Sequence, residues 1–149
     1  MGQGNPCIQC GACCAFFRVS FFWEESAPDD PLGVPAELTE ENDEMFQSMK
    51  GTNQHSPRCI ALQGKIGRQV SCAIYAQRSS TCREFGLHET DHVISVSSID
   101  LDRCNQARKA WNLPPLNRAD LLSLPIALSI RAVPAPNHPF IKNHHPRLF

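Results

Sequence analysis

The sequence predicts a small, irregular α+β domain with short strands, two or three helices and a Pro-rich C-terminal tail. Three observations support this fold class: eight of the 149 residues are cysteine, the apolar segments are short, and seven of the 12 prolines follow residue 113. A core built from such short segments is thin, and small domains with thin cores usually depend on disulfide bonds or a bound metal. We therefore divide the chain into a cysteine-cluster, metal-stabilised domain, residues 1–113, and a tail, residues 114–149, which we expect to be partly disordered.

Composition narrows the functional classes. Lys and Arg total 14 and Asp and Glu total 15, so the chain lacks the basic excess of nucleic-acid-binding proteins, and we expect no nucleic-acid partner. The chain opens without the apolar run of a secretory leader, and its longest apolar stretch, residues 121–133, is interrupted by Pro125 and Arg131. These features predict a cytoplasmic protein with no membrane partner. Because thiols stay reduced in the cytosol, we favour metal or redox chemistry over a disulfide framework.

The first third of the chain predicts one strand, one loop and one helix. Side chains alternate from Phe17 to Trp23, which predicts a strand with a buried face. The segment 24–44 holds nine carboxylates and no Lys or Arg; its first half predicts a loop, and we expect a solvated surface. Thr39 is expected to cap a helix that ends at Gly51. The apolar stripe of that helix would consist of Met45, Phe46 and Met49.

Two apolar segments around a Gly-rich link, Cys59–Leu62 and Arg68–Cys72, predict a β-hairpin. Pairing would bring the two outer ends, and therefore Cys59 and Cys72, close together. The segment that follows, residues 73–85, predicts a loop or a short helix.

The last predicted elements are a short strand over Val93–Val96 and a helix over Leu101–Leu113. This helix carries Cys104 and ends at Pro114-Pro115, because proline cannot continue a helix. About one helical turn is expected near residues 119–123 of the tail.

The strongest signal is the N-terminal motif Cys7-x-x-Cys10-Gly11-Ala12-Cys13-Cys14. Two residues between cysteines let a tight turn direct both sulfurs at one ion, and Gly11 permits a backbone conformation that other residues resist. The same spacing overlaps the start of a ferredoxin-type run, so spacing alone does not choose between zinc and an iron–sulfur cluster. In an extended segment Cys13 and Cys14 would point to opposite sides. They would then serve two different metals, or only one of them would be a ligand.

All eight cysteines are candidate metal ligands. Their number equals that of two four-cysteine sites, but one site with spare cysteines is equally allowed. Cys104 also fits an ordinary buried cysteine in its helix. The candidates are Cys7, Cys10, Cys13, Cys14, Cys59, Cys72, Cys82 and Cys104.

The order of these residues resembles the YkgJ-like cysteine-cluster family, described as a zinc- or iron-chelating CxxCxxCC domain. The resemblance covers roughly residues 5–113. It implies metal chelation in a bacterial cytosolic protein, without a settled reaction. This chain departs from the family's usual pattern at Ser79, where proline is usual, a change that removes no ligand. The matching positions are the N-terminal motif, Cys59, Cys72, Tyr75, Arg78, Cys82, Arg83, Phe85, Cys104 and Arg108.

Several other side chains are candidates for supporting roles. Arg78, Arg83 and Arg108 would stabilise thiolates electrostatically, or would simply be surface or Glu-paired arginines. We expect Tyr75 to pack in the core. The histidines are weaker ligand candidates, and we favour no ligand role for His55, His88, His92, His144 or His145.

No catalytic motif is present, so no catalytic residue is assigned and we do not expect an enzyme. The leading hypothesis is a cysteine-thiolate protein that chelates zinc or iron, in a structural or metal-handling role. One alternative is an iron–sulfur oxidoreductase or electron carrier. A second alternative is a thiol-based redox sensor or adaptor, whose protein partner the sequence does not identify.

Overall fold

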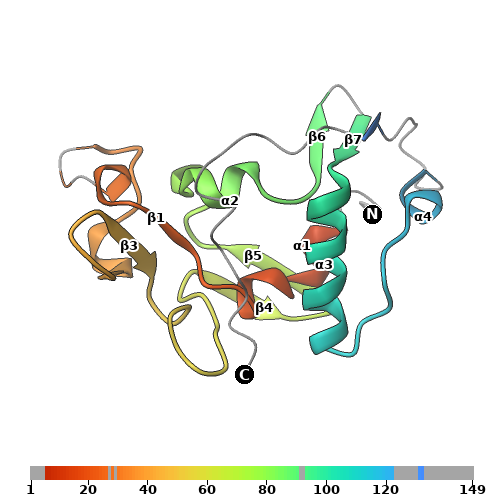
Figure 1. Ribbon diagram of the computed structural model, residues 1–149, viewed down its shortest axis with the longest axis horizontal. Helices are drawn as coiled ribbons and strands as arrows, with labels where there is room; N and C mark the ends of the chain where they lie inside the picture. Colours follow the sequence, from red (N-terminus) through yellow and green to blue (C-terminus); the bar gives the residue numbers. More distant parts are fainter. Residues whose placement is uncertain (1–5, 27, 29, 91–92, 123–130, 133–149) are drawn as a thin grey trace.

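The computed structural model describes residues 6–26, 28, 30–90, 93–122 and 131–132. In this part of the chain, short strands form small sheets, short helices connect them, and a longer helix, α3 (Ser98–Ala110), lies at one side (Figure 1). The predicted fold class, a small and irregular α+β domain, is confirmed. The remainder of the predicted tail, 123–130 and 133–149, lies outside the described residues, as does His92.

The first sheet is antiparallel and has the strand order β1-β3-β2. It consists of β1 (Ser20–Phe22), β2 (Thr39–Glu41) and β3 (Phe46–Met49). Strand β1 is shorter than the predicted one. At its start the chain is still turning, because the Phe17 amide donates to Cys13 O (3.1 Å). At its end the 3₁₀ helix η2 (Trp23–Ser26) begins directly after Phe22.

The helix predicted between Thr39 and Gly51 is wrong, because this segment forms the hairpin of β2 and β3. An Asp43 carboxylate oxygen accepts hydrogen bonds from the amides of Met45 (2.8 Å) and Phe46 (2.9 Å), which closes a turn. Strand pairing then separates the supposed stripe: Met49 is 2% exposed and Met45 is 52% exposed. Turn chemistry and pairing with β1 therefore override a spacing that is compatible with a helix.

The second sheet is a hairpin formed by β4 (Leu62–Lys65) and β5 (Gln69–Cys72), which confirms the predicted hairpin and its second strand. The first strand was wrongly placed at Cys59–Leu62, because residues 63–65, predicted as part of the link, pair in the ladder. Leu62 pairs with Cys72, so the ladder begins three residues after Cys59. Gly64 has a φ of +91°, and a Cβ there would lie 2.2 Å from Gln69 O. Glycine is therefore required where the two strands approach.

The third sheet has the order β6-β7-β8, with β6 (His88–Thr90), β7 (Val93–Val96) and β8 (Arg131–Ala132). It leads into α3, whose first turn is capped by Ser97: the Oγ atom accepts a hydrogen bond from the Asp100 amide (3.0 Å). The predicted strand at 93–96 and the predicted helix around Cys104 are both confirmed.

The remaining elements are short. The structure confirms a short helix within residues 73–85 and a helical turn near residues 119–123. The short elements not yet described are α1 (Cys7–Cys10), η1 (Cys13–Ala15), η3 (Ala36–Leu38), η4 (Tyr75–Gln77), α2 (Ser80–Glu84) and α4 (Arg118–Leu122).

The core is divided into three small clusters, and cysteines contribute to all of them. Cys59 belongs to a cluster beneath the first sheet, Cys10 to a cluster with α3, and Cys7 packs on a cluster around β7. The last cluster also contains Leu121 of the predicted tail. The cysteines thus pack in small separate clusters, and the described residues form no single large apolar core. No helix in the described ranges combines the length and apolar character needed to cross a bilayer.

We predict that Ser97→Ala lowers the free energy of unfolding by about 1 kcal/mol, because the first turn of α3 loses its cap. Ser98→Ala is the matched control, since Ser98 is exposed and makes no cap bond. Urea unfolding of both variants measures the difference. Equal stability of the two variants would contradict the capping role of Ser97.

Candidate metal centre

The N-terminal cysteines are positioned by one helical turn and a glycine. Helix α1 spans Cys7–Cys10 and ends at Gly11, which has a left-handed φ of +69°. A Cβ at Gly11 would lie 2.8 Å from a methyl carbon of Val70 in β5. The Cys10 carbonyl accepts from the Gly67 amide (2.9 Å). The motif is therefore seated directly on the second hairpin, and Gly11 is needed both for its φ and for the close approach.

Cys13 and Cys14 follow in the 3₁₀ turn η1 rather than in an extended segment. The Cys13 thiol donates a hydrogen bond to the Cys14 sulfur, so the two side chains lie together. The Cys14 carbonyl accepts from the Cys59 amide (2.8 Å), which ties the motif to the start of the hairpin.

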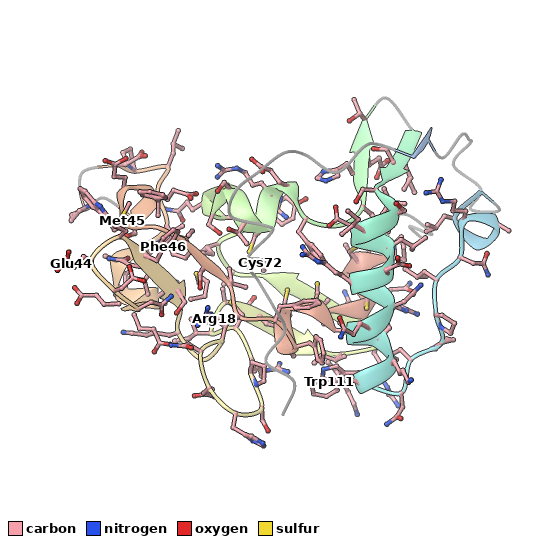
Figure 2. The ribbon with its side chains drawn as sticks, in the orientation of Figure 1. Arg18, Glu44, Met45, Phe46, Cys72 and Trp111 are labelled. Atoms are coloured by element: carbon pink, nitrogen blue, oxygen red, sulfur yellow. The ribbon has the colours of Figure 1, made fainter. Side chains whose placement is uncertain are left out.

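The other four cysteines come from four different places in the fold. Cys59 precedes β4, Cys72 ends β5, Cys82 lies in α2 and Cys104 lies in the middle of α3. Figure 2 shows Cys72 in the centre of the view, between the first sheet and α3. None of the eight cysteines forms a disulfide bond.

All eight cysteines line a single cavity of about 1110 Å³. Basic side chains line it as well: Arg18, Arg78, Arg83 and Arg103, together with His88. Arg18 and Arg103 were not predicted, since nothing in their sequence neighbourhood distinguishes them from surface arginines.

Electrostatic contacts divide the thiols into two groups. Cys7 interacts with Cys104 and Cys10, and Cys13 interacts most strongly with Cys14 and then with Cys7 and Cys104. Cys82 interacts with Cys14, Cys59 and Cys72. We call the first group the helix-side group; it comprises Cys7, Cys10, Cys13 and Cys104. We call the second group the hairpin-side group; it comprises Cys14, Cys59, Cys72 and Cys82. The hydrogen bond between the Cys13 and Cys14 side chains joins the two groups, and Cys14 also interacts electrostatically with Cys7.

Burial keeps most of these thiols protonated. It raises the pKa of Cys7 and of Cys82 to about 12, and the pKa of Cys59 and of Cys104 to about 11. Neighbouring cysteines add to this rise, because two thiolates repel each other. Near neutral pH these side chains are neutral unless a cation supplies the charge that thiolates need.

Cys14 behaves differently. Its pKa lies below the ordinary value, because Cys13 donates a hydrogen bond to its sulfur and because Arg78 and Arg58 place positive charge nearby. Arg78 also opposes the rise in the pKa of Cys72, and Arg108 opposes that of Cys104. The positive charges of Arg78 and Arg108 therefore act on these cysteines in the direction expected of residues that stabilise thiolates.

The structure corrects the expectation for Tyr75. It is 65% exposed and is not a core residue. The Arg78 guanidinium lies 3.8 Å from the centre of its ring, and Arg78 Nε donates to Tyr75 O (2.9 Å). Both side chains line the cavity, where they stand beside the hairpin-side group.

The histidines that the sequence offered as weaker ligand candidates differ in whether they line the cavity. His88 lines the cavity, and its Nε2 atom lies 2.9 Å from Glu84 O, a hydrogen-bonding contact. His55 is exposed and does not line it. His92, His144 and His145 lie outside the described residues.

Thiols match the donor preference of zinc and of iron–sulfur clusters, so the donor set fits both. Within the described residues, however, no three Cys, His, Asp or Glu side chains are already arranged around a common point as a metal site requires. Metal binding would therefore replace thiol protons and draw the sulfurs of each group inward. Such coupling between deprotonation and site formation is common in thiolate sites.

Comparison with known families decides the classification. Residues 6–109 match the model of the CxxCxxCC family, described as "Putative zinc- or iron-chelating domain". The chain belongs to this family. All eight cysteines fall within the matched range, and the family description supports binding of zinc or iron in general terms.

Two curated proteins are similar to the chain. It is 50% identical over 117 residues to "Uncharacterized protein YkgJ" of Escherichia coli O157:H7, covering 78% of this chain and 100% of that protein. It is 45% identical over 117 residues to "Putative ferredoxin" of Acinetobacter calcoaceticus, covering 75% of this chain and 78% of that protein. No solved structure matches the chain.

We predict that Gly11→Ala destabilises the protein by about 2 to 4 kcal/mol, because it combines a left-handed φ with a clash against Val70. Gly86→Ala is the matched control: Gly86 has a φ of +94°, but its Cβ would meet nothing within 4 Å. It should cost about 1 kcal/mol. Unfolding curves of both variants measure the difference, and equal losses would mean that the contact between α1 and β5 is not tight.

We predict that the metal-free protein loses stability as the pH rises from about 9 towards 12. Burial raises the pKa of Cys7 and Cys82 to about 12 from an ordinary 9.0, so the folded chain holds more protons than the unfolded chain in this window. Stability is therefore complete below pH 9 and declines above it. Urea midpoints between pH 7 and 11 test this, and a midpoint that stays constant or rises would contradict it.

Proposed function

We propose that this chain is a cytoplasmic cysteine-thiolate protein with two four-cysteine metal sites, which hold zinc or iron in a structural or metal-handling role. The observation that carries the proposal is that eight thiols from distant parts of the chain line one cavity. The electrostatic contacts among these thiols support their division into two groups of four. Membership in a family of zinc- or iron-chelating domains supports the same function.

The energetics of the cavity support bound metal. The eight thiols line one cavity, and burial disfavours the charged form of most of them, as the raised pKa values of Cys7 and Cys82 show. Metal coordination would convert each group into thiolates that are paired with a cation. Since the ligands come from distant segments, much of the binding energy would appear as folding energy.

Zinc fits the proposal because it takes four thiolates tetrahedrally at about 2.3 Å in closed structural sites. The assignment of the eight cysteines follows the two groups. In the helix-side group, Cys104 of α3 would complete the three N-terminal ligands. In the hairpin-side group, Cys14 would join the three cysteines at 59, 72 and 82.

An iron–sulfur electron carrier is the second candidate. The curated relative from Acinetobacter is named "Putative ferredoxin", and the motif has a ferredoxin-type C-x-x-C-x-x-C start. A cavity of about 1110 Å³ is also far larger than a single ion with four sulfurs needs. Positive charge from Arg78 near Cys14 would stabilise an anionic cluster.

Metal analysis and an absorption spectrum distinguish the two candidates, using protein purified without oxygen and without a metal-affinity column. Two zinc ions per chain and no visible absorbance support the zinc proposal. Iron with equal acid-labile sulfide and broad visible absorbance supports the cluster. Protein that contains neither zinc nor iron in this preparation would overturn the proposed function.

We predict that Cys104→Ser and Cys82→Ser each remove one of the two metals, because each serine replaces a ligand of a different group. The double variant should lose both. Native mass spectrometry under oxygen-free conditions counts the metals retained. If either single substitution abolished both metals while the chain stayed folded by circular dichroism, the ligands would belong to one shared centre.

A further inference from the structure

The two groups of cysteines differ in how the fold encloses them. In the helix-side group, Cys10 is 7% exposed and Cys104 is 9% exposed, whereas Cys7 and Cys13 are half-buried. Cys10 packs in a cluster with Ala12 and with Ala107 of α3, which have no exposed surface, and Cys13 packs against this cluster. A metal bound by this group would have a helix on one side and a packed core beneath it.

The hairpin-side group is less enclosed, because three of its four cysteines are half-buried, against two of the four in the helix-side group. Cys72 ends β5, where its sequence neighbours Ser71 and Ala73 are both exposed and Cys72 itself is half-buried. Of the four ligands, only Cys59 is buried. A metal in this group would therefore be reached from outside through the side of Cys72.

Tyr75 and Arg78 stand at this side of the cavity. Their side chains are stacked, and the Arg78 carbonyl accepts a hydrogen bond from an Arg83 guanidinium nitrogen. The η4 turn that carries Tyr75 is attached to the loop between β1 and β2, because Gln77 Nε2 donates to Pro31 O (3.2 Å) and Gly33 O (3.3 Å). Tyr75 is 65% exposed, although it lines the same cavity as the thiols. An exposed aromatic ring held in place by a cation beside a half-buried ligand fits a cover over that ligand.

We infer that the hairpin-side group is an exchangeable metal site, covered by Tyr75 and Arg78, whereas the helix-side group is a closed structural site. This inference rests on the proposed function and deepens it, because it assigns the metal-handling role to one group. The cargo is a thiophilic divalent cation, and the entry point for an incoming chelator or thiol donor is Cys72. Ligand exchange would proceed with one thiolate leaving the metal and taking up a proton while the incoming sulfur or nitrogen donor takes its place.

The test is the kinetics of metal release from the full chain loaded with two zinc ions, measured with an excess of the chromogenic chelator 4-(2-pyridylazo)resorcinol in the absence of oxygen. We expect two phases of equal amplitude. Cys82→Ser should remove the fast phase, and Cys104→Ser should remove the slow phase. A single phase for both ions, or loss of the fast phase in Cys104→Ser, would overturn the inference.

The cover has its own variants. Tyr75→Ala and Arg78→Gln should each accelerate the fast phase about tenfold, the scale of outer-shell effects on metal sites, and leave the slow phase unchanged. Met45→Ala is the matched control, since Met45 is a comparably exposed apolar residue at the far end of the molecule and does not line the cavity (Figure 2). Equal acceleration of both phases, or none, would contradict a cover over the hairpin-side group.

A measurement on the unaltered protein avoids the risk that a variant fails to fold. The zinc-loaded chain is treated with iodoacetamide, and the modified cysteines are identified by mass spectrometry over time. Cys72 should be alkylated first and Cys10 and Cys104 last. The reverse order would overturn the inference. A chain that retains no zinc before the experiment would instead count against the proposed function, so the two failures are distinguishable.

Discussion

Eight cysteine side chains crowded around one cavity are the constraint on which the rest of the structure depends. A buried thiol is a weak hydrogen-bonding group, and a buried thiolate is costly. Because of this cost, burial raises the pKa values of Cys7 and Cys82. A bound cation removes the conflict, because it lets the thiolates be buried and paired at once. The three small core clusters, each too small to stabilise a domain of this size alone, are consistent with a fold that depends on such a partner.

The scaffold is organised to bring distant cysteines to that cavity. One helical turn closed by Gly11 seats the N-terminal motif on β5, and the amide of Cys59 binds the carbonyl of Cys14. Helix α3, which carries Cys104, packs beside the motif, since its Ala107 shares a cluster with Cys10 and Ala12 (Figure 1). Short strands and 3₁₀ turns suffice for this purpose, because the elements need to present sulfur atoms at defined places more than they need to bury apolar surface.

The sequence was informative wherever the signal was local. A hairpin ending at Cys72, the strand at 93–96 and the helix around Cys104 were predicted from periodicity and from glycine and proline positions, although the first strand of the hairpin lies at residues 62–65 rather than at 59–62. The helix predicted after Thr39 was wrong. The spacing of Met45, Phe46 and Met49 suits a helix, but the Asp43 turn and pairing with β1 make this segment a strand. The prediction that Tyr75 packs in the core was also wrong. An aromatic residue is usually buried, but here it stacks on Arg78 at the edge of the cavity.

The division of the cysteines into two groups could not be predicted from spacing. Cys13 and Cys14 are adjacent in the chain, and only the packing of α1 against the hairpin and α3 determines that they face different neighbours. The arginines that line the cavity, such as Arg18 and Arg103, were missed because they come from unrelated segments. The ligand assignment itself remains a proposal that joins this geometry to the donor chemistry of sulfur.

X-ray absorption at the metal edge tests that central claim most directly, using the full chain prepared without oxygen. The account predicts a first shell made of sulfur alone, about four sulfur atoms per metal at about 2.3 Å for zinc. A first shell that contains nitrogen or oxygen in place of two or more sulfurs would contradict it, because histidine or carboxylate ligands would then replace the cysteines of one group.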